Sequence, residues 1–81
     1  MTREDIFEGI QEILSEELDI DKDEVQLGSN LINDIGLSSV EVMNLIASVE
    51  KAFSIRISEK LLRTFVTTQD IVDCIAAKLE G

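Results

Sequence analysis

The stretch DIGLSSVE, residues 34–41, joins a flexible turn to the start of a helix. Ser38 is a favourable N-cap residue, and Glu41 follows it by three positions, as in a capping box. We therefore expect a helix to begin at Ser39. A side chain in this first turn is exposed, and its hydroxyl lies beside unpaired backbone N–H groups that favour an anion. Ser39 is thus a candidate to carry a phosphate ester, whereas Ser38 serves as the cap.

The helix that begins at Ser39 is predicted to extend to about Phe53, because its apolar residues repeat every three or four positions. Its core-facing stripe consists of Val42, Leu45, Ile46, Val49 and Phe53. An earlier helix is expected from Thr2 to about Leu18, with Thr2 as N-cap and Asp5 in the box position. The stripe of this first helix consists of Ile6, Ile10, Ile13, Leu14 and Leu18.

Two more helices are expected in the last third of the chain. Ser58 caps a short one, whose inward-facing residues would be Leu61, Leu62 and Phe65. Thr67, with Asp70 three positions later, opens a longer one that continues to about Leu79. Its predicted stripe consists of Ile71, Val72, Ile75, Ala76 and Leu79.

Residues 19–37 show no sustained period and contain two glycines, so they are expected to form a long loop between the first two long helices. Leu31 and Ile32 could form a short helical turn within it. The expected apolar anchors of the loop are Val25, Leu27, Leu31, Ile32 and Ile35. We therefore predict an all-α fold, a small four-helix bundle of three long helices and one short helix, in a single domain that spans residues 1–81.

The amino-acid composition argues against several classes of function. The net charge of −10 argues against nucleic acid or anionic membrane as partners and favours basic protein surfaces. The chain has no histidine, the usual general base, so catalysis of its own is not expected.

No apolar run reaches the roughly 20 residues of a membrane span, and no signal peptide is recognisable. The single cysteine, Cys74, is expected to be a small buried hydrophobe. These features indicate a cytoplasmic protein, expected to be a monomer.

One acidic run has the spacing of a calcium loop. Asp19, Asp21 and Asp23 occupy its first, third and fifth positions. A calcium loop then needs glycine at the sixth position and a bidentate glutamate at the twelfth, where this chain has Glu24 and Asn30. We therefore interpret the run as solvated loop residues and predict no metal site.

The sequence 36–40, Gly-Leu-Ser-Ser-Val, resembles the motif of acyl carrier proteins and of their peptidyl carrier relatives, which is a glycine, one further residue and then usually Asp-Ser-Leu. The resemblance continues through Glu50 and Phe53 into the short third helix, and on to the threonine pair that opens the last helix. It covers the whole chain and is most specific over residues 31–75.

This resemblance implies that Ser39 accepts 4'-phosphopantetheine from coenzyme A in a reaction catalysed by a separate, magnesium-dependent phosphopantetheinyl transferase. The thiol of that arm would carry an acyl group as a thioester and present it to acyl-loading and acyl-processing enzymes of fatty acid, polyketide or specialised lipid synthesis. Physical chemistry supports the position, because the phosphodiester would lie at the positive end of a helix.

Four residues near Ser39 are candidate partner contacts. Val40 and Ala47 would form a small apolar patch, and Glu41 and Glu50 would flank it with charge. Carriers of fatty acid synthesis commonly have more acidic residues on this helix. This chain departs from them at Asn44 and Lys51 on the helix, and also at Ser38, the residue before Ser39, where the family usually has aspartate. These departures favour a specialised carrier with its own partner enzymes.

Two alternatives remain open from the sequence. The chain could be a peptidyl or aminoacyl carrier, or it could be an unmodified acidic helical domain that binds a partner through Val40, Glu41 and Ala47. An enzyme with Ser39 as nucleophile would lack a histidine base.

Overall fold

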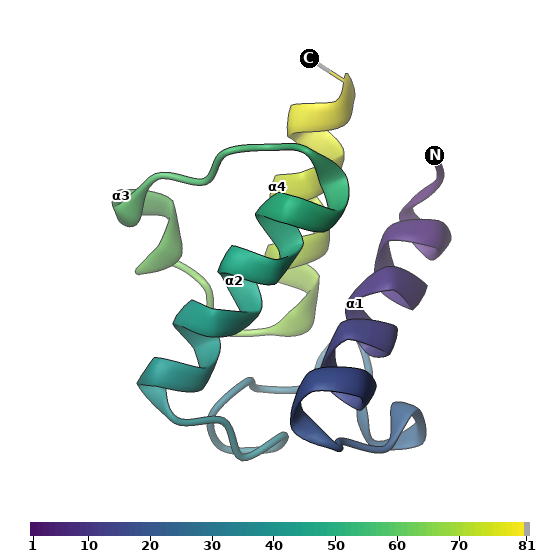
Figure 1. The fold of residues 1–81 in the computed structure, drawn as a ribbon, viewed down its shortest axis with the longest axis vertical. Helices are drawn as coiled ribbons and strands as arrows, with labels where there is room; N and C mark the ends of the chain where they lie inside the picture. The colour runs from purple at the N-terminus through teal and green to yellow at the C-terminus, as the bar shows by residue number, and fades with distance from the viewer. Residues whose placement is uncertain (81) are drawn as a thin grey trace.

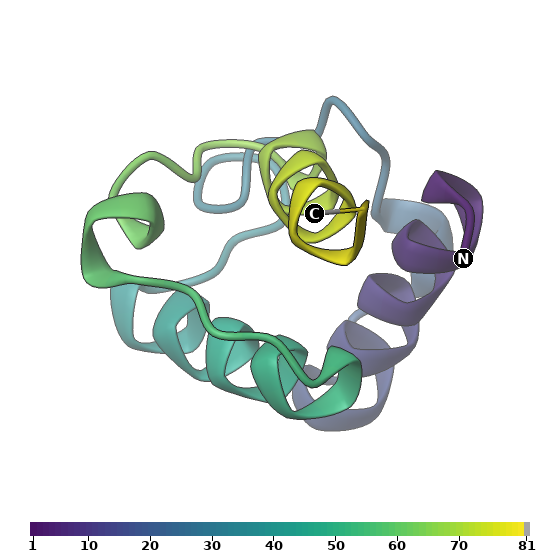
Figure 2. The same cartoon turned by 90° about the horizontal axis from the view of Figure 1, so that it is seen from above.

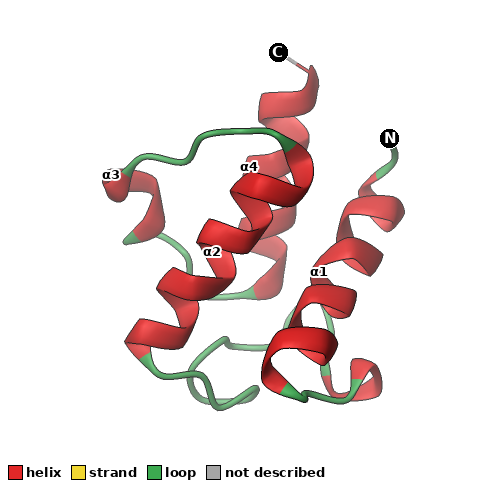
Figure 3. Cartoon of the chain, viewed as in Figure 1, coloured by secondary structure: helices red, strands yellow, loops and turns green. Residues whose placement is uncertain are grey.

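The computed structural model describes residues 1–80; Gly81, the last residue of the expected domain, lies outside them. Within this range the chain forms helices joined by loops, with no strand longer than an isolated bridge (Figures 1 and 3). The elements in chain order are α1 (Arg3–Leu18), the 3₁₀-helix η1 (Lys22–Glu24), α2 (Ser39–Phe53), α3 (Glu59–Leu62) and α4 (Thr68–Glu80). The predicted all-α fold is confirmed, and η1 is an element that the sequence did not predict.

The three long helices surround a common core, and α3 lies beside α2 and α4 on the side away from α1 (Figure 2). The core is aliphatic, as a chain with only three aromatic residues requires. Its most deeply buried hydrophobic side chains are Ile6, Ile10, Leu14, Val25, Leu31, Leu45, Ile46, Val49, Ile71, Val72 and Ile75. The predicted stripes of α1, α2 and α4 therefore meet in the centre of the molecule.

Side-chain caps set the helix starts. The Thr2 hydroxyl accepts the N–H of Asp5 at 3.1 Å, and the Asp5 carboxylate accepts the N–H of Thr2, which completes a capping box at α1. The Ser58 hydroxyl accepts the N–H of Leu61 at α3. Both starts were predicted from the sequence, because a cap acts within four residues.

The long loop is attached to the start of α4. Asn30 and Thr67 form the isolated antiparallel bridge, and the N–H of Leu31 donates to the carbonyl of Val66 at 2.9 Å. Within the loop, the N–H of Asp34 donates to the carbonyl of Asn30, which closes the turn expected around residues 31 and 32. These bonds bring the segment before α2 and the segment before α4 side by side.

Some predicted core residues are exposed. In the loop, Val25 and Leu31 are buried, but Leu27 and Ile32 are not. On α3, Leu61 is 39% exposed, because a helix of one turn can direct only part of its surface inward and Leu62 takes that position.

The predicted stripe of α4 is also too long. Leu79 is 42% exposed, and Figure 1 shows the last turn of α4 extending past the neighbouring end of α2. A residue there repeats the helical spacing of the stripe but has no core beside it. Ile75 and Ala76 are the last residues of α4 that are buried.

Helices α1 and α2 approach closely at Gly9. A Cβ atom built on this residue would lie 2.8 Å from Cζ of Phe53, closer than real Cβ contacts allow. The glycine does not interrupt α1, and the ring of Phe53 occupies the space that a side chain would need.

Candidate functional site

The first turn of α2 is built by a glycine turn and a complete capping box. Gly36 has φ +88°, a left-handed conformation that L side chains rarely adopt. The Ser38 hydroxyl accepts the N–H of Glu41 at 3.2 Å, and Oε1 of Glu41 accepts the N–H of Ser38 at 2.9 Å. The helix therefore begins at Ser39, as predicted.

Ser39 is exposed, and its hydroxyl has no role in this cap. Glu41 and Val42 donate their N–H groups to Ser38, but within residues 1–80 the N–H groups of Ser39 and Val40 have no acceptor. Unpaired N–H groups at a helix N-terminus favour a negative charge. The position thus combines a reachable hydroxyl with a backbone that would stabilise a phosphate ester.

A cleft of about 260 Å³ adjoins Ser39. Its remaining lining residues come from the long loop, from α2 and from the α3 region, and are Ile32, Val42, Met43, Leu62, Arg63 and Phe65. The sequence interpretation did not include Met43 or Ile32 in the site. Met43 stands four residues after Ser39, a spacing that puts both on one helix face, so this signal was present in the sequence. The contribution of Ile32 depends on the path of the loop.

The four candidate partner contacts lie in different surroundings. Val40 is 65% exposed beside Ser39. Ala47 is exposed and lines a separate cleft of about 320 Å³ between α1 and α2. Glu41 is half-buried and engaged in the capping box. Oε2 of Glu50 accepts the N–H of Ile57 at 2.8 Å, so this carboxylate holds the link between α2 and α3.

The acidic run of residues 19–23 and Cys74 lie outside the first turn of α2. Oδ1 of Asp21 accepts the N–H of Asp23 and caps η1. No cluster of three or more metal-ligating side chains occurs among residues 1–80. Cys74 is half-buried, and this burial raises the pKa of its thiol, although nearby Lys78 acts in the opposite direction.

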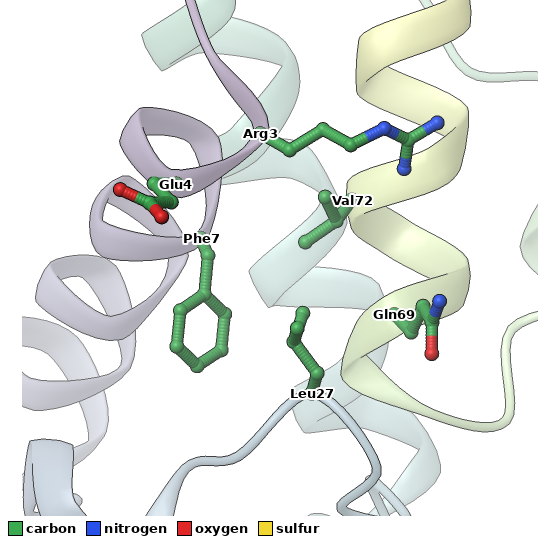
Figure 4. A pocket seen from close by; sticks show the side chains of 6 residues that line it. All are labelled: Arg3, Glu4, Phe7, Leu27, Gln69 and Val72. Carbon is green, nitrogen blue, oxygen red and sulfur yellow. The ribbon is translucent and has the colours of Figure 1, made fainter.

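A smaller, apolar cavity of about 130 Å³ lies between α1 and α4 (Figure 4). Phe7 of α1, Leu27 of the loop and Val72 of α4 project toward it, and Arg3 reaches across its rim toward α4. Arg3 pairs there with Asp73. None of its lining residues belongs to α2 or α3, so this cavity is separate from the cleft at Ser39.

Comparison with known proteins defines the class. Residues 8–75 match the family described as the phosphopantetheine attachment site. The chain is 34% identical to the acyl carrier protein of Coprothermobacter proteolyticus, over 98% of this chain and 96% of that one. It is 35% identical to the acyl carrier protein of Guillardia theta, over 98% of each chain.

Comparison with a solved structure supports the same family. The crystal structure of the acyl carrier protein from Thermotoga maritima superposes with a TM-score of 0.88 at 26% identity, and the match covers 96% of this chain and 91% of that one. The chain belongs to the acyl carrier protein family. Proteins of this family act as carriers, and their prosthetic group is 4'-phosphopantetheine.

The residues at the start of α2 fit such a group. Attachment needs an accessible hydroxyl, which Ser39 offers, and a place for the negative charge, which the free N–H groups of the first turn offer. The cleft beside Ser39, lined mostly by hydrophobic side chains, would give such an arm a surface to lie against. Within residues 1–80, no helix is both long and apolar enough to cross a bilayer.

Proposed function

We propose that this chain carries acyl groups as thioesters on a 4'-phosphopantetheine arm attached to the hydroxyl oxygen of Ser39. The observation that carries the proposal is the exposed position of Ser39 at the first residue of α2, beside a cleft lined mostly by hydrophobic side chains. When bound, the arm supplies a free thiol, a nucleophile that the half-buried Cys74 does not provide. The chain itself acts as a carrier and not as an enzyme.

In the loading reaction, Ser39 contributes its oxygen and loses a proton. The Ser39 oxygen forms a bond to the phosphorus that bears the pantetheine, and the bond from that phosphorus to the bridging pyrophosphate oxygen of coenzyme A breaks. The leaving product is adenosine 3',5'-bisphosphate, and the transferase takes up the proton. The chain holds the acceptor in place, since the Ser38 cap fixes the first turn of α2.

The partners we propose are a phosphopantetheinyl transferase and enzymes that load and process acyl groups. They would meet the face that carries Val40 and Met43, which are both exposed next to Ser39. Ala47, Glu41 and Glu50 remain proposed contacts, the two carboxylates with an additional structural role.

The pathway is proposed as fatty acid, polyketide or specialised lipid synthesis, with a specialised carrier favoured. The support for specialisation is the weak acidity of the exposed face of α2, where Asn44 and Lys51 are exposed, together with Ser38 in place of the usual aspartate. Efficient use of the loaded chain by the condensing and reducing enzymes of bacterial fatty acid synthesis would argue against it. We also propose that residues 1–81 form one domain and act as a cytoplasmic monomer.

Loading can be measured directly. The chain is incubated with coenzyme A, Mg²⁺ and a broad-specificity phosphopantetheinyl transferase, and its intact mass is recorded. We expect wild type to gain one phosphopantetheine and Ser39→Ala to gain none. Ser48→Ala is the matched control, because Ser48 lies on the same helix but donates to Glu17 on α1. No gain in wild type, or an equal gain in Ser39→Ala, would refute the proposal.

A further inference from the structure

Arg63 is the one charged residue among those that line the cleft beside Ser39. Apart from these two residues the lining is hydrophobic, with side chains from the loop, from α2 and from the α3 region. Arg63 also lines an adjoining cleft of about 240 Å³, together with Met43, Glu59 and Leu62. The side chain therefore stands between two hollows on the side of α2 where an arm on Ser39 would lie.

The guanidinium of Arg63 is unpaired within residues 1–80. The ion pairs in this range are Arg3 with Asp73 and Lys22 with Glu12, and no side-chain hydrogen bond involves Arg63. Glu59 precedes Arg63 by four residues, the spacing of a helical ion pair, yet the two are not bridged. All five guanidinium donors thus remain available to another group.

The surrounding segment is basic in an otherwise acidic chain. Residues 51–63 contain four of the seven basic residues and one acidic residue, whereas the rest of the chain contains three basic and sixteen acidic residues. The four basic side chains are Lys51, Arg56, Lys60 and Arg63, and all four are exposed. Of these four, Lys60 lies on α3 and Arg63 is its C-cap residue, so an anion that approaches the α3 side of the cleft meets these two positive side chains.

From these observations we propose that Arg63 binds an anionic oxygen group that the arm on Ser39 brings into the cleft. The proposal rests on the proposed attachment at Ser39 and adds the chemistry that the cleft selects. A guanidinium can form two parallel hydrogen bonds to a phosphate or a carboxylate, which a lysine ammonium cannot do in the same planar geometry.

Two sources can supply that oxygen group. One is the phosphodiester of the arm itself, which is present in every loaded form. The other is a carboxylate at the far end of the acyl group, which would make acyl groups with an acidic end the preferred cargo. A hydrocarbon chain alone offers no hydrogen-bond acceptor to the Arg63 guanidinium.

Three loaded forms distinguish these sources. The transferase is supplied with coenzyme A, butyryl-coenzyme A or succinyl-coenzyme A; the two acyl groups each have four carbons, and succinyl ends in a carboxylate where butyryl ends in a methyl group. The side-chain Nε–Hε NMR signal of Arg63 is compared with that of the unloaded chain. In the succinyl form, the pKa of the ¹³C-labelled terminal carboxyl is also measured.

If the phosphodiester is bound, the Arg63 signal shifts equally in all three forms. If the carboxylate is bound, the signal shifts in the succinyl form alone, and the carboxyl pKa is lower than in free succinyl-pantetheine. Arg63→Gln should abolish that lowering. Lys60→Gln, the matched loss of one positive charge on α3, should leave most of it in place.

The proposal is overturned if loading is complete by mass but the Arg63 signal shifts in none of the three forms. It is also overturned if Lys60→Gln removes the effect as fully as Arg63→Gln, because the response would then reflect the general charge of α3. A chain that gains no mass refutes the attachment at Ser39 and this proposal with it, so the two failures are distinguished before any spectrum is recorded.

Discussion

The starts of α2 and α4 use the same local chemistry. Ser38 and Glu41 form the capping box of α2. At α4, Oδ2 of Asp70 accepts the N–H groups of Thr67 and Val66 at 3.0 and 2.8 Å, and the Thr67 hydroxyl accepts the N–H of Asp70 at 3.4 Å. In both places a second hydroxyl residue follows the cap, and it becomes the first residue of the helix.

The surroundings of these second hydroxyls differ. Thr68 is 0% exposed and its oxygen has no partner within residues 1–80, and its N–H donates to the carbonyl of Ser29 at 3.2 Å. Ser39 is exposed, and its N–H has no acceptor in that range. The capping box determines where each helix begins, and the packing around it determines whether the next hydroxyl is accessible to another enzyme.

The largest expected effect is on phosphopantetheine loading, which tests the contrast between Ser39 and Thr68. Thr68→Val removes the hydroxyl at the start of α4 and should still load completely, whereas Ser39→Ala should not load at all. Valine has the shape of threonine and removes a buried hydroxyl without a partner, so the variant should fold. Intact mass after the transferase reaction gives both results. A loss of loading in Thr68→Val, with its circular dichroism unchanged, would contradict the contrast.

Asp70→Ala, in the capping box of α4, should destabilise the chain more than Glu41→Ala, in the capping box of α2. The Asp70 carboxylate accepts two backbone N–H groups outside the helix, while Glu41 accepts one. Charge-assisted hydrogen bonds of this kind contribute about 1.5–3 kcal/mol each, and partial exposure of the carboxylate reduces the sum to about 2 kcal/mol. Glu41→Ala should cost about 1 kcal/mol. Urea denaturation measures both, and equal losses would show that the two boxes are equivalent.

The contribution of Asp70 should depend on pH. Backbone N–H donation from Thr67 and Val66 lowers the pKa of Asp70, so its stabilising effect is complete at neutral pH and is lost as the pH falls through the folded-state pKa. The difference in unfolding free energy between wild type and Asp70→Ala should therefore narrow between pH 7 and about pH 3. Urea titrations at both pH values test this, and a constant difference would contradict it.

The smallest of these expected effects is the difference in stability between Ser38→Ala and Ser39→Ala. Ser38→Ala removes the acceptor for the N–H of Glu41 and should cost about 1 kcal/mol. Ser39→Ala removes an exposed hydroxyl that takes no part in the helix cap, and it should change the unfolding free energy by less than about 0.5 kcal/mol. Thermal or urea denaturation of the unloaded variants gives the order. The reverse order would mean that α2 starts one residue later.

Features that depend on a few neighbouring residues could be predicted from the sequence. The caps Thr2, Ser38 and Ser58 act within one turn, and the start of α2 at Ser39 followed from them. The core stripes of α1 and α2 followed from helical periodicity, which reports the direction of a side chain. Periodicity does not report what lies opposite, and for this reason Leu79 was wrongly assigned to the core.

Features that depend on distant parts of the chain could not be predicted. The bridge of Asn30 to Thr67 joins segments far apart in the sequence, and the cleft at Ser39 needs Ile32 and Phe65 from two such segments. The bond from the Ile57 N–H to Glu50 also depends on the path of the link after α2. The exposed position of Ser39 at the first residue of α2 was predictable because its environment is local, whereas the shape of the cleft was not.

The contact of Gly9 with Phe53 also matters for engineering this scaffold. Replacement of a helical glycine by alanine is a standard way to raise thermal stability, because it favours the helix by roughly 1 kcal/mol. Here the new methyl group would displace an aromatic ring that packs against the core. A designer who wants a more heat-resistant carrier should therefore leave Gly9 unchanged, or should replace Phe53 with a smaller side chain in the same variant.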